Sequence, residues 1–389
     1  MTEHPFWLVR RLSIVLLLPL AACTALNTPT VEPVAYPQVG EVSLNIAEIE
    51  PAQHQLLDIG IIVFENDEDE SAARTYGDRV FAEVREKEIR YLPFLLRKVL
   101  IESQQWGAVR VLPEADPSVD LLISGKILRS SGTELALQID ATDSTGRSWL
   151  SAIYGDAAML SDYPEDIRFT PSRPFIPSEH QEPYLDLYEN IGNDLIAIRD
   201  KLSVSDLQTI RDVSTLVYAN DLSPESFGHM LTTNDAGLLE AASLPAENDP
   251  MLARVKDMRV RHHVFIDTVD EYYGALHDEM VQAYIMWRRH SFDQQEQLVS
   301  REQEPVSQDF FSSSSSGYLT MTQRYNRYRW SKIYRQEFQE LAAGFNQELA
   351  PAILELNEQV HGLSGTMAEQ YIQWRRILRQ LFELETGSI

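Results

Sequence analysis

Residues 56–64 read Leu-Leu-Asp-Ile-Gly-Ile-Ile-Val-Phe, a nearly continuous apolar run rich in β-branched side chains. Such a run is typical of a strand that is buried on both faces of a sheet. An acidic stretch follows at residues 65–70, and apolar residues at helical spacing then continue to Trp106-Gly107. A strand followed by a long helix is the beginning of an α/β or α+β arrangement.

Further strands are expected downstream of this helix. Leu135, Leu137 and Ile139 alternate with more polar residues, which predicts a half-buried strand. The sequence Asp143-Ser144-Thr145-Gly146 predicts the turn of a hairpin. The expected strands after the helix cover residues 109–112, 119–128, 135–139 and 147–154. The fold class predicted for residues 52–155 is therefore α+β, with a mixed sheet and a flanking helix.

This region resembles a known periplasmic module. The strand of residues 59–64, the stretch Val111-Leu112-Pro113-Glu114 and the stretch of residues 120–127 are similar to the α/β domain of three families. These are the curli-secretion lipoproteins, the TolB N-terminal domain and the flagellar FlgO-type lipoproteins. The resemblance covers about residues 50–155 and implies a binding or assembly role. No amphipathic membrane hairpins follow in the sequence, so the pore of the curli family is not expected here.

The second half of the chain is predicted to be helical. Residues 156–183 are rich in proline and are expected to be a linker before an elongated helical domain, residues 184–389. The longest predicted helix runs from Pro250 to about Arg301, with one apolar face formed by Phe265, Val269, Tyr272, Leu276, Met280, Tyr284 and Trp287. Another helix is expected after Pro351, carrying Ile353, Leu356 and Val360.

A short internal repeat lies within the helical half. Residues 284–289 (Tyr-Ile-Met-Trp-Arg-Arg) and residues 371–376 (Tyr-Ile-Gln-Trp-Arg-Arg) share five of six positions. One interpretation is that two similar helices pack in one bundle, with each tryptophan at the edge of the core and the arginines outside. The other is a pair of Trp-Arg-Arg faces that together bind a partner.

A basic and aromatic segment provides further candidates for partner binding. Residues 324–335 contain five cationic and four aromatic side chains and no acid, within a strongly acidic protein. Such a segment fits an anionic partner or the protein's own acidic helix, which carries Asp267, Asp270, Glu271 and Asp278. The candidate partner-binding residues from the repeat and this segment are Trp287, Arg288, Arg289, Arg327, Arg329, Trp330, Trp374, Arg375 and Arg376.

The N-terminus has the features of an export signal. Arg10 and Arg11 precede a short apolar run that is too short to span a membrane. Leu20-Ala21-Ala22-Cys23 then resembles the lipobox of bacterial lipoproteins. That resemblance implies cleavage between Ala22 and Cys23, removal of residues 1–22, and acylation of Cys23 with palmitate-type chains that anchor the protein in a lipid bilayer.

The residues after the cysteine suggest where such an anchor would place the protein. Thr24 stands where lipoproteins kept at the inner membrane tend to carry aspartate, so the outer membrane is expected, with the protein facing the periplasm. Inner-membrane or surface-exposed placement remains open. Residues 23–51 are rich in proline and are expected to form a lipidated flexible tether.

Net charge and the absence of common catalytic motifs limit the classes of function that fit the sequence. The chain has 389 residues and a formal net charge of -26, which disfavours nucleic acid as a partner. Motifs for zinc proteases, serine hydrolases, nucleotide phosphates and dinucleotides are absent from the sequence, and no cofactor, metal ligand or catalytic residue is assigned. The expected function is a non-enzymatic binding or assembly component of the cell envelope with another envelope protein as partner. The alternative is an envelope enzyme or small-ligand-binding lipoprotein with its site between the two domains.

Overall fold

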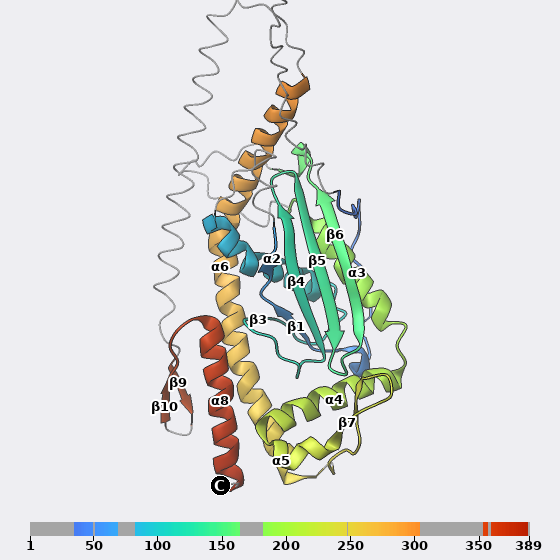
Figure 1. Cartoon of the computed structure of the whole chain (residues 1–389), viewed down its shortest axis with the longest axis vertical. Helices are drawn as coiled ribbons and strands as arrows, with labels where there is room; N and C mark the ends of the chain where they lie inside the picture. The colour runs from blue at the N-terminus through green and yellow to red at the C-terminus, as the bar shows by residue number, and fades with distance from the viewer. Residues whose placement is uncertain are drawn as a thin grey trace, which may run out of the picture. The chain divides into compact units, whose positions relative to one another are not determined.

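Figure 1 shows the computed structural model, which describes residues 35–49, 51–68, 82–163, 182–246, 248–303, 353–356 and 359–387. Contacts within the chain divide it into residues 1–35 and residues 36–389, and every element below belongs to the second unit. The helices and strands of the first expected domain are β1 Ile59–Ile62, β2 Glu65–Asn66, α2 Ala82–Glu102, β3 Val109–Leu112, β4 Leu121–Ser130, β5 Glu134–Asp143 and β6 Ser148–Ala157.

These strands form one mixed sheet, as the sequence predicts. The strand order is β3-β1-β4-β5-β6, and the short β2 also pairs with β4. β1 is parallel to both β3 and β4, whereas β4, β5 and β6 form an antiparallel meander. The parallel pairs surround β1, which explains its nearly continuous apolar sequence.

Side-chain alternation sets which face of the sheet is buried. In β4, Leu121, Ile123 and Ile127 are fully buried, while the alternate residues Leu122, Ser124 and Lys126 are only partly buried. β5 buries Leu137 and Ile139 in the same core cluster. This pattern is the one expected for an antiparallel region with one face toward the core and one toward solvent.

Two helices cover the buried face of the sheet. α2 and α3 (Leu185–Arg199) share a hydrophobic core with β1, β4 and β5. α2 contains Pro93, which has no N–H to bond the carbonyl of Ile89 one turn earlier. That carbonyl instead accepts the backbone N–H of Phe64 at 2.8 Å, so the proline leaves an acceptor that ties α2 to the end of β1.

The longest helix, α6 (Pro250–Gln303), confirms the sequence prediction within two residues at its end. Its 54 residues correspond to about 80 Å at 1.5 Å per residue. All seven residues of the predicted apolar face contact the core: six are buried, and Tyr272 is partly buried against it. The first half of α6 packs with α4 (Val204–Leu222) and α8 (Met367–Thr386) in a second core cluster, and its second half joins the core of the sheet.

The helical half also contains strands that were not predicted. β9 (Ile353–Leu356) and β10 (Gln359–Gly362) pair as an antiparallel hairpin where a helix was expected, so that prediction is wrong. Short apolar runs fit either structure by spacing alone, which explains the error. β7 (Leu231–Thr233) and β8 (Leu239–Ala241) form a second hairpin. Among the described residues, the remaining short helices are η1 Gln53–Gln55, η2 Leu160–Asp162, α5 Pro224–Phe227 and η4 Gly228–Met230.

The region expected to be a tether differs from the prediction over residues 36–49. These residues make hydrogen bonds to β6, to α3 and to Ser103 directly after α2, so a free tether would end near residue 35. Residues 23–34 of the expected tether, and Ala22, lie outside the described residues. Most of the expected linker, residues 164–181, also lies outside them, so the domain boundary at residues 156–183 stays a prediction.

Candidate functional site

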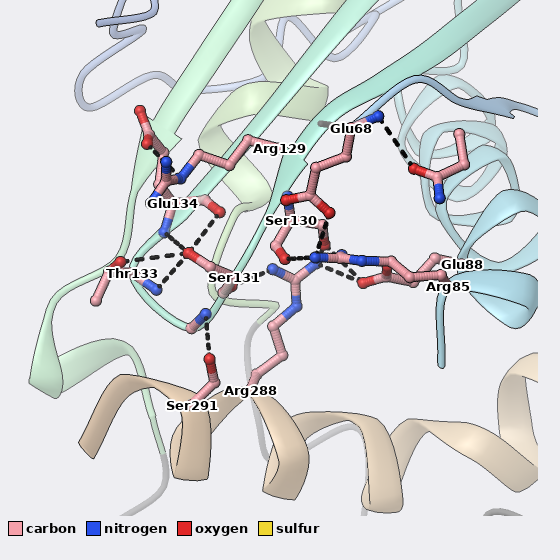
Figure 2. Close-up of polar contacts among 12 residues, drawn as sticks. Glu68, Arg85, Glu88, Arg129, Ser130, Ser131, Thr133, Glu134, Arg288 and Ser291 are labelled. Atoms are coloured by element: carbon pink, nitrogen blue, oxygen red, sulfur yellow. Dashed lines mark hydrogen bonds and ion pairs between the residues drawn. The ribbon is translucent and has the colours of Figure 1, made fainter. Parts of the chain in front are cut away.

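A buried polar network lies in the first two turns of α2, and we call it the Glu88 network. Glu88 is fully buried and lies on the side of α2 that faces the sheet. Arg85, three residues earlier, donates from Nη1 to Glu88 Oε2 at 2.7 Å. Arg85 Nη2 also contacts Glu68 and the carbonyl of Ser130, which places three chain segments around one guanidinium (Figure 2).

The second guanidinium of this network comes from α6. Arg288 is fully buried, and its Nη2 lies 2.9 Å from Ser130 Oγ and 3.4 Å from Glu88 Oε1. Its Nη1 donates to the carbonyl of Ser131. The guanidinium also lies over the ring of Tyr184 at 4.7 Å and that of Tyr284 at 4.8 Å. Figure 2 shows Arg288 reaching from the helix toward Ser130 and Glu88.

Glu88 receives two further hydrogen bonds that complete its shell. Ser130 Oγ donates to Glu88 Oε1 at 2.6 Å, and the hydroxyl of Tyr284 donates to the same oxygen at 2.8 Å. Burial by itself would raise the pKa of Glu88, but Arg85, Arg288 and Ser130 outweigh it and hold that pKa below its ordinary value. The carboxylate is therefore ionised at neutral pH. A buried carboxylate keeps its charge only when cations and hydrogen-bond donors surround it, as they do here.

Close packing of the β4–β5 turn on α6 supports this network. A Cβ atom at Gly132 would overlap the backbone of Arg288 and Phe292, so only glycine allows the approach. The amide of Gly132 donates to Ser291 Oγ at 3.1 Å. The turn therefore contacts α6 through its backbone, at the same helical turns that carry Arg288.

A second buried carboxylate joins α8 to the sheet region. Asp116 lies in the loop between β3 and β4 and is 1% exposed. The hydroxyl of Tyr371 donates to Asp116 Oδ2 at 2.7 Å, and Ser118 donates to Oδ1 through its amide and its hydroxyl. Burial opposes ionisation, but Arg375, His262 and Ser118 lower the pKa of Asp116 to about 2.

The two sites explain the sequence repeat. In the first copy, Tyr284 donates to Glu88 and Arg288 lies 3.4 Å from the same carboxylate. In the second copy, Tyr371 donates to Asp116, and Nη1 of the corresponding arginine, Arg375, lies 4.0 Å from that carboxylate. Each copy thus places a tyrosine and, four residues later, an arginine around one buried acid.

The other predicted partner-binding residues of the repeat occupy different environments. Trp287 and Trp374 are 5% and 1% exposed and lie in the two hydrophobic cores, so neither they nor Arg288 presents a surface to a partner. The burial favours the core-packing interpretation of the repeat, with one correction: Arg288 lies inside the protein, whereas that interpretation places the arginines outside. Arg289 and Arg375 are partly exposed, and Arg376 is exposed. Arg289 pairs with Asp293 at 3.1 Å, and Arg375 Nη2 pairs with Asp221 at 2.8 Å.

The remaining sequence candidates lie outside the described residues. These are Ala22, Cys23, Arg327, Arg329 and Trp330. Of the acids suggested as their intramolecular match, Asp270 accepts from the amide of Val111 and pairs with Arg97, and Asp267 pairs with Arg110 at 2.5 Å. These two acids of α6 therefore already have basic partners among the described residues.

Sequence reasoning missed Glu88 and Asp116, although a signal for Glu88 exists. Val84, Leu92, Leu95 and Val99 form the apolar stripe of the predicted helix, and Glu88 fills the gap in that stripe. A carboxylate on a buried stripe requires a cationic partner. Asp116 has no such local signal, because its partners Tyr371 and Arg375 lie more than 250 residues away.

The burial of the Glu88 network favours a role in holding α6 against the sheet over a role in catalysis. Glu88 and Arg288 have no solvent-exposed surface, so a substrate does not reach them in this conformation. Within the described residues, no three His, Cys, Asp or Glu side chains are grouped to hold a metal ion.

Among the helices described, none is both long and apolar enough to cross a membrane. No family model matches the chain, and no curated protein matches it significantly.

Proposed function

We propose that this protein is a lipid-anchored lipoprotein of the bacterial envelope that binds or helps to assemble another envelope protein without catalysing a reaction. The observation that carries the proposal is Leu20-Ala21-Ala22-Cys23, placed directly after a basic and apolar export signal. Cys23 would carry the anchor, and the folded part would face the periplasm, at the outer membrane. Acyl chains on one cysteine contribute about 0.8 kcal/mol per buried methylene, so several chains anchor a protein stably.

The interior of the folded part is consistent with a binding protein. Three of its buried ionic groups, Glu88, Arg85 and Arg288, are engaged with one another and with backbone carbonyls. Groups used in this way fix α6 against the sheet and leave the outer faces to contact a partner. In this proposal residues 52–155 act as the α/β part and residues 184–389 as the helical part of one binding protein.

The outer face of α6 offers suitable positions for testing the proposal. Val260 and Val264 lie one helical turn apart and are 61% and 56% exposed. Single exposed valines are ordinary, but two at this spacing on a long helix give a small apolar patch. Phe265, directly after Val264, is buried and serves as the matched control.

The experiment places a photo-crosslinking residue at position 264 in living cells, and at 265 as the control. We expect position 264 to capture one envelope protein, position 265 to capture none, and Cys23→Ser to lose both palmitate labelling and the crosslink. Normal processing and labelling of Cys23→Ser would overturn the anchor. Failure of position 264 to capture any protein in correctly labelled cells would overturn α6 as the docking helix.

A further inference from the structure

Residues 36–49, which we call the strap, lie along the edge of the sheet instead of extending freely from the N-terminal segment. The amide of Val39 donates to the carbonyl of Gly155 at 2.9 Å, and the amide of Gly155 donates to the carbonyl of Pro37 at 2.7 Å. Gln38 thereby pairs with Gly155 in a parallel bridge on β6, the last strand of the sheet. The strap thus covers part of an edge that would otherwise present unpaired backbone groups.

Beyond the sheet edge, the strap crosses α3. Asp186 Oδ1 accepts the amide of Val42 at 2.9 Å, and Asn193 Oδ1 accepts the amide of Asn45 at 2.8 Å. Asn193 also donates through Nδ2 to the carbonyl of Ser43 at 2.9 Å. Side chains of one helix therefore hold the backbone of the strap at two successive places.

Two glycines form the surface on which the strap lies. A Cβ atom at Gly155 would lie 2.8 Å from the carbonyl oxygen of Pro37, closer than real Cβ contacts allow. A Cβ atom at Gly192 of α3 would lie 3.4 Å from Leu44 Cδ1, an ordinary van der Waals distance. A side chain at position 155 would therefore displace the strap, whereas a methyl group at position 192 would add a contact to it.

The strap adheres weakly compared with the strands beneath it. Its apolar residues Val39 and Leu44 are only partly buried, and Ile46 and Ile49 are 51% and 85% exposed. The hydrogen bonds with Asn193 are exposed to solvent. Segments with few buried contacts and exposed hydrogen bonds open at a lower free energy than the core of a protein.

We propose that residues 36–49 are a releasable strap that stores chain length between the folded part and the anchoring cysteine. Release of these residues adds a segment that spans at most about 46–50 Å when fully extended at 3.3–3.6 Å per residue. The use of that length rests on the proposed anchor at Cys23. The release itself depends only on the contacts of the strap with the folded part, which involve β6, α3 and also Ser103, whose carbonyl accepts the amide of Ala47 at 2.9 Å.

The first test measures amide hydrogen exchange of the full chain in three forms: wild type, Gly155→Val and Gly192→Ala. In wild type, the amides of Val39, Val42 and Asn45 should exchange at least tenfold faster than those of β5. Gly155→Val should accelerate the strap amides at least tenfold further and leave β5 unchanged, because valine favours a strand. Gly192→Ala should slow the same amides.

Two outcomes would overturn the proposal. One is strap amides in wild type that exchange as slowly as β5, which would make the strap an integral part of the sheet. The other is unchanged exchange of the strap in both variants. The exchange rates of the β5 amides report directly whether Gly155→Val folds. If it does not fold, the strap rates in wild type and in Gly192→Ala still test the proposal.

The second test measures reach on phosphatidylethanolamine–phosphatidylglycerol vesicles. Lipidated protein labelled at Leu384→Cys, an exposed position of α8, should transfer energy to a dye in the bilayer less efficiently in Gly155→Val than in wild type. Equal transfer despite faster strap exchange would overturn the storage of length. Protein that does not bind the vesicles at all would contradict the anchor instead, while the exchange rates would still report on the strap.

Discussion

Glu88 and Arg288 lie 200 residues apart in sequence, yet each has its charge fully removed from water. Removing Arg288 leaves Arg85 to face two carboxylates, Glu68 and Glu88, so one buried negative charge lacks compensation, which costs about 3–5 kcal/mol. We expect Arg288→Met to lower the free energy of unfolding by about 3 kcal/mol or more. Arg289→Met, one residue later on the same helix, should cost less than about 1 kcal/mol because its pair with Asp293 is partly solvated.

Urea unfolding followed by far-ultraviolet circular dichroism measures both variants. The comparison is sharp because the two substitutions remove the same group from adjacent positions of α6. Equal losses in Arg288→Met and Arg289→Met would contradict the role given to the Glu88 network. A large loss confined to Arg288→Met supports it.

At the scale of single residues, the sequence predicted burial better than it predicted partners. The apolar face of α6 and the strand of residues 109–112 follow from spacing that is local to the chain. The pairing of Tyr371 with Asp116 does not, because nothing in either local sequence specifies the other. The similar Tyr-Ile-x-Trp-Arg-Arg stretches indicated two related environments, and their buried acids became visible only with the fold.

In helix α2, the missing backbone N–H of Pro93 leaves a carbonyl free to bond the chain at the end of β1. Pro93 removes the N–H that would bond the carbonyl of Ile89, and the amide of Phe64 takes its place at 2.8 Å. In an ordinary helix interior, alanine is more favourable than proline by about 3 kcal/mol. Here the helix is already adapted to the proline, so Pro93→Ala should stabilise the protein by clearly less than that.

The same substitution should change the link between α2 and β1. The new amide at position 93 would compete with Phe64 for the carbonyl of Ile89. We expect the Phe64 amide to exchange several-fold faster in Pro93→Ala, while amides of β5 keep their rates. A gain of about 3 kcal/mol with unchanged Phe64 exchange would contradict this account of the proline.

The bounds of an element could be predicted where the spacing of its apolar residues fits only a helix or only a strand. The prediction was wrong where the spacing fits both. The ends of α6 and β3 agree with the sequence because long or strongly apolar segments admit one interpretation. The sequence of the β9–β10 hairpin predicts a helix instead, because its apolar residues are three and four positions apart. The turn between β7 and β8 contains Asn234 and Gly237, two residue types that favour turns, and the φ of Gly237 is 79°. These residues could have indicated the hairpin from the sequence.

Across the whole molecule, stability depends on pH through buried groups that act in opposite directions. Burial raises the pKa of Glu182 to about 7, against the opposing effects of Arg288 and Lys98. Burial lowers the pKa of His262 to about 4, although Asp116 opposes this. Their ordinary values are 4.5 and 6.5, so both groups act over nearly the same range of pH.

The sign of each contribution follows from which state binds the proton. Between pH 4.5 and 7 the folded state holds a proton on Glu182 that the unfolded state releases, so Glu182 lowers the free energy of unfolding as pH rises. Between pH 4 and 6.5 the unfolded state holds a proton on His262 that the folded state lacks, so His262 raises that free energy as pH rises.

Two variants separate these contributions when unfolded in urea at half-unit steps from pH 4 to 8. Relative to Glu182→Gln, wild type should lose stability from about pH 4.5 to 7 and stay level above that range. Relative to His262→Gln, wild type should gain stability from about pH 4 to 6.5. Differences with the same slope in both comparisons would contradict the assignment, because a carboxyl that is buried as a neutral acid and an imidazole buried as a neutral base must respond to pH in opposite senses.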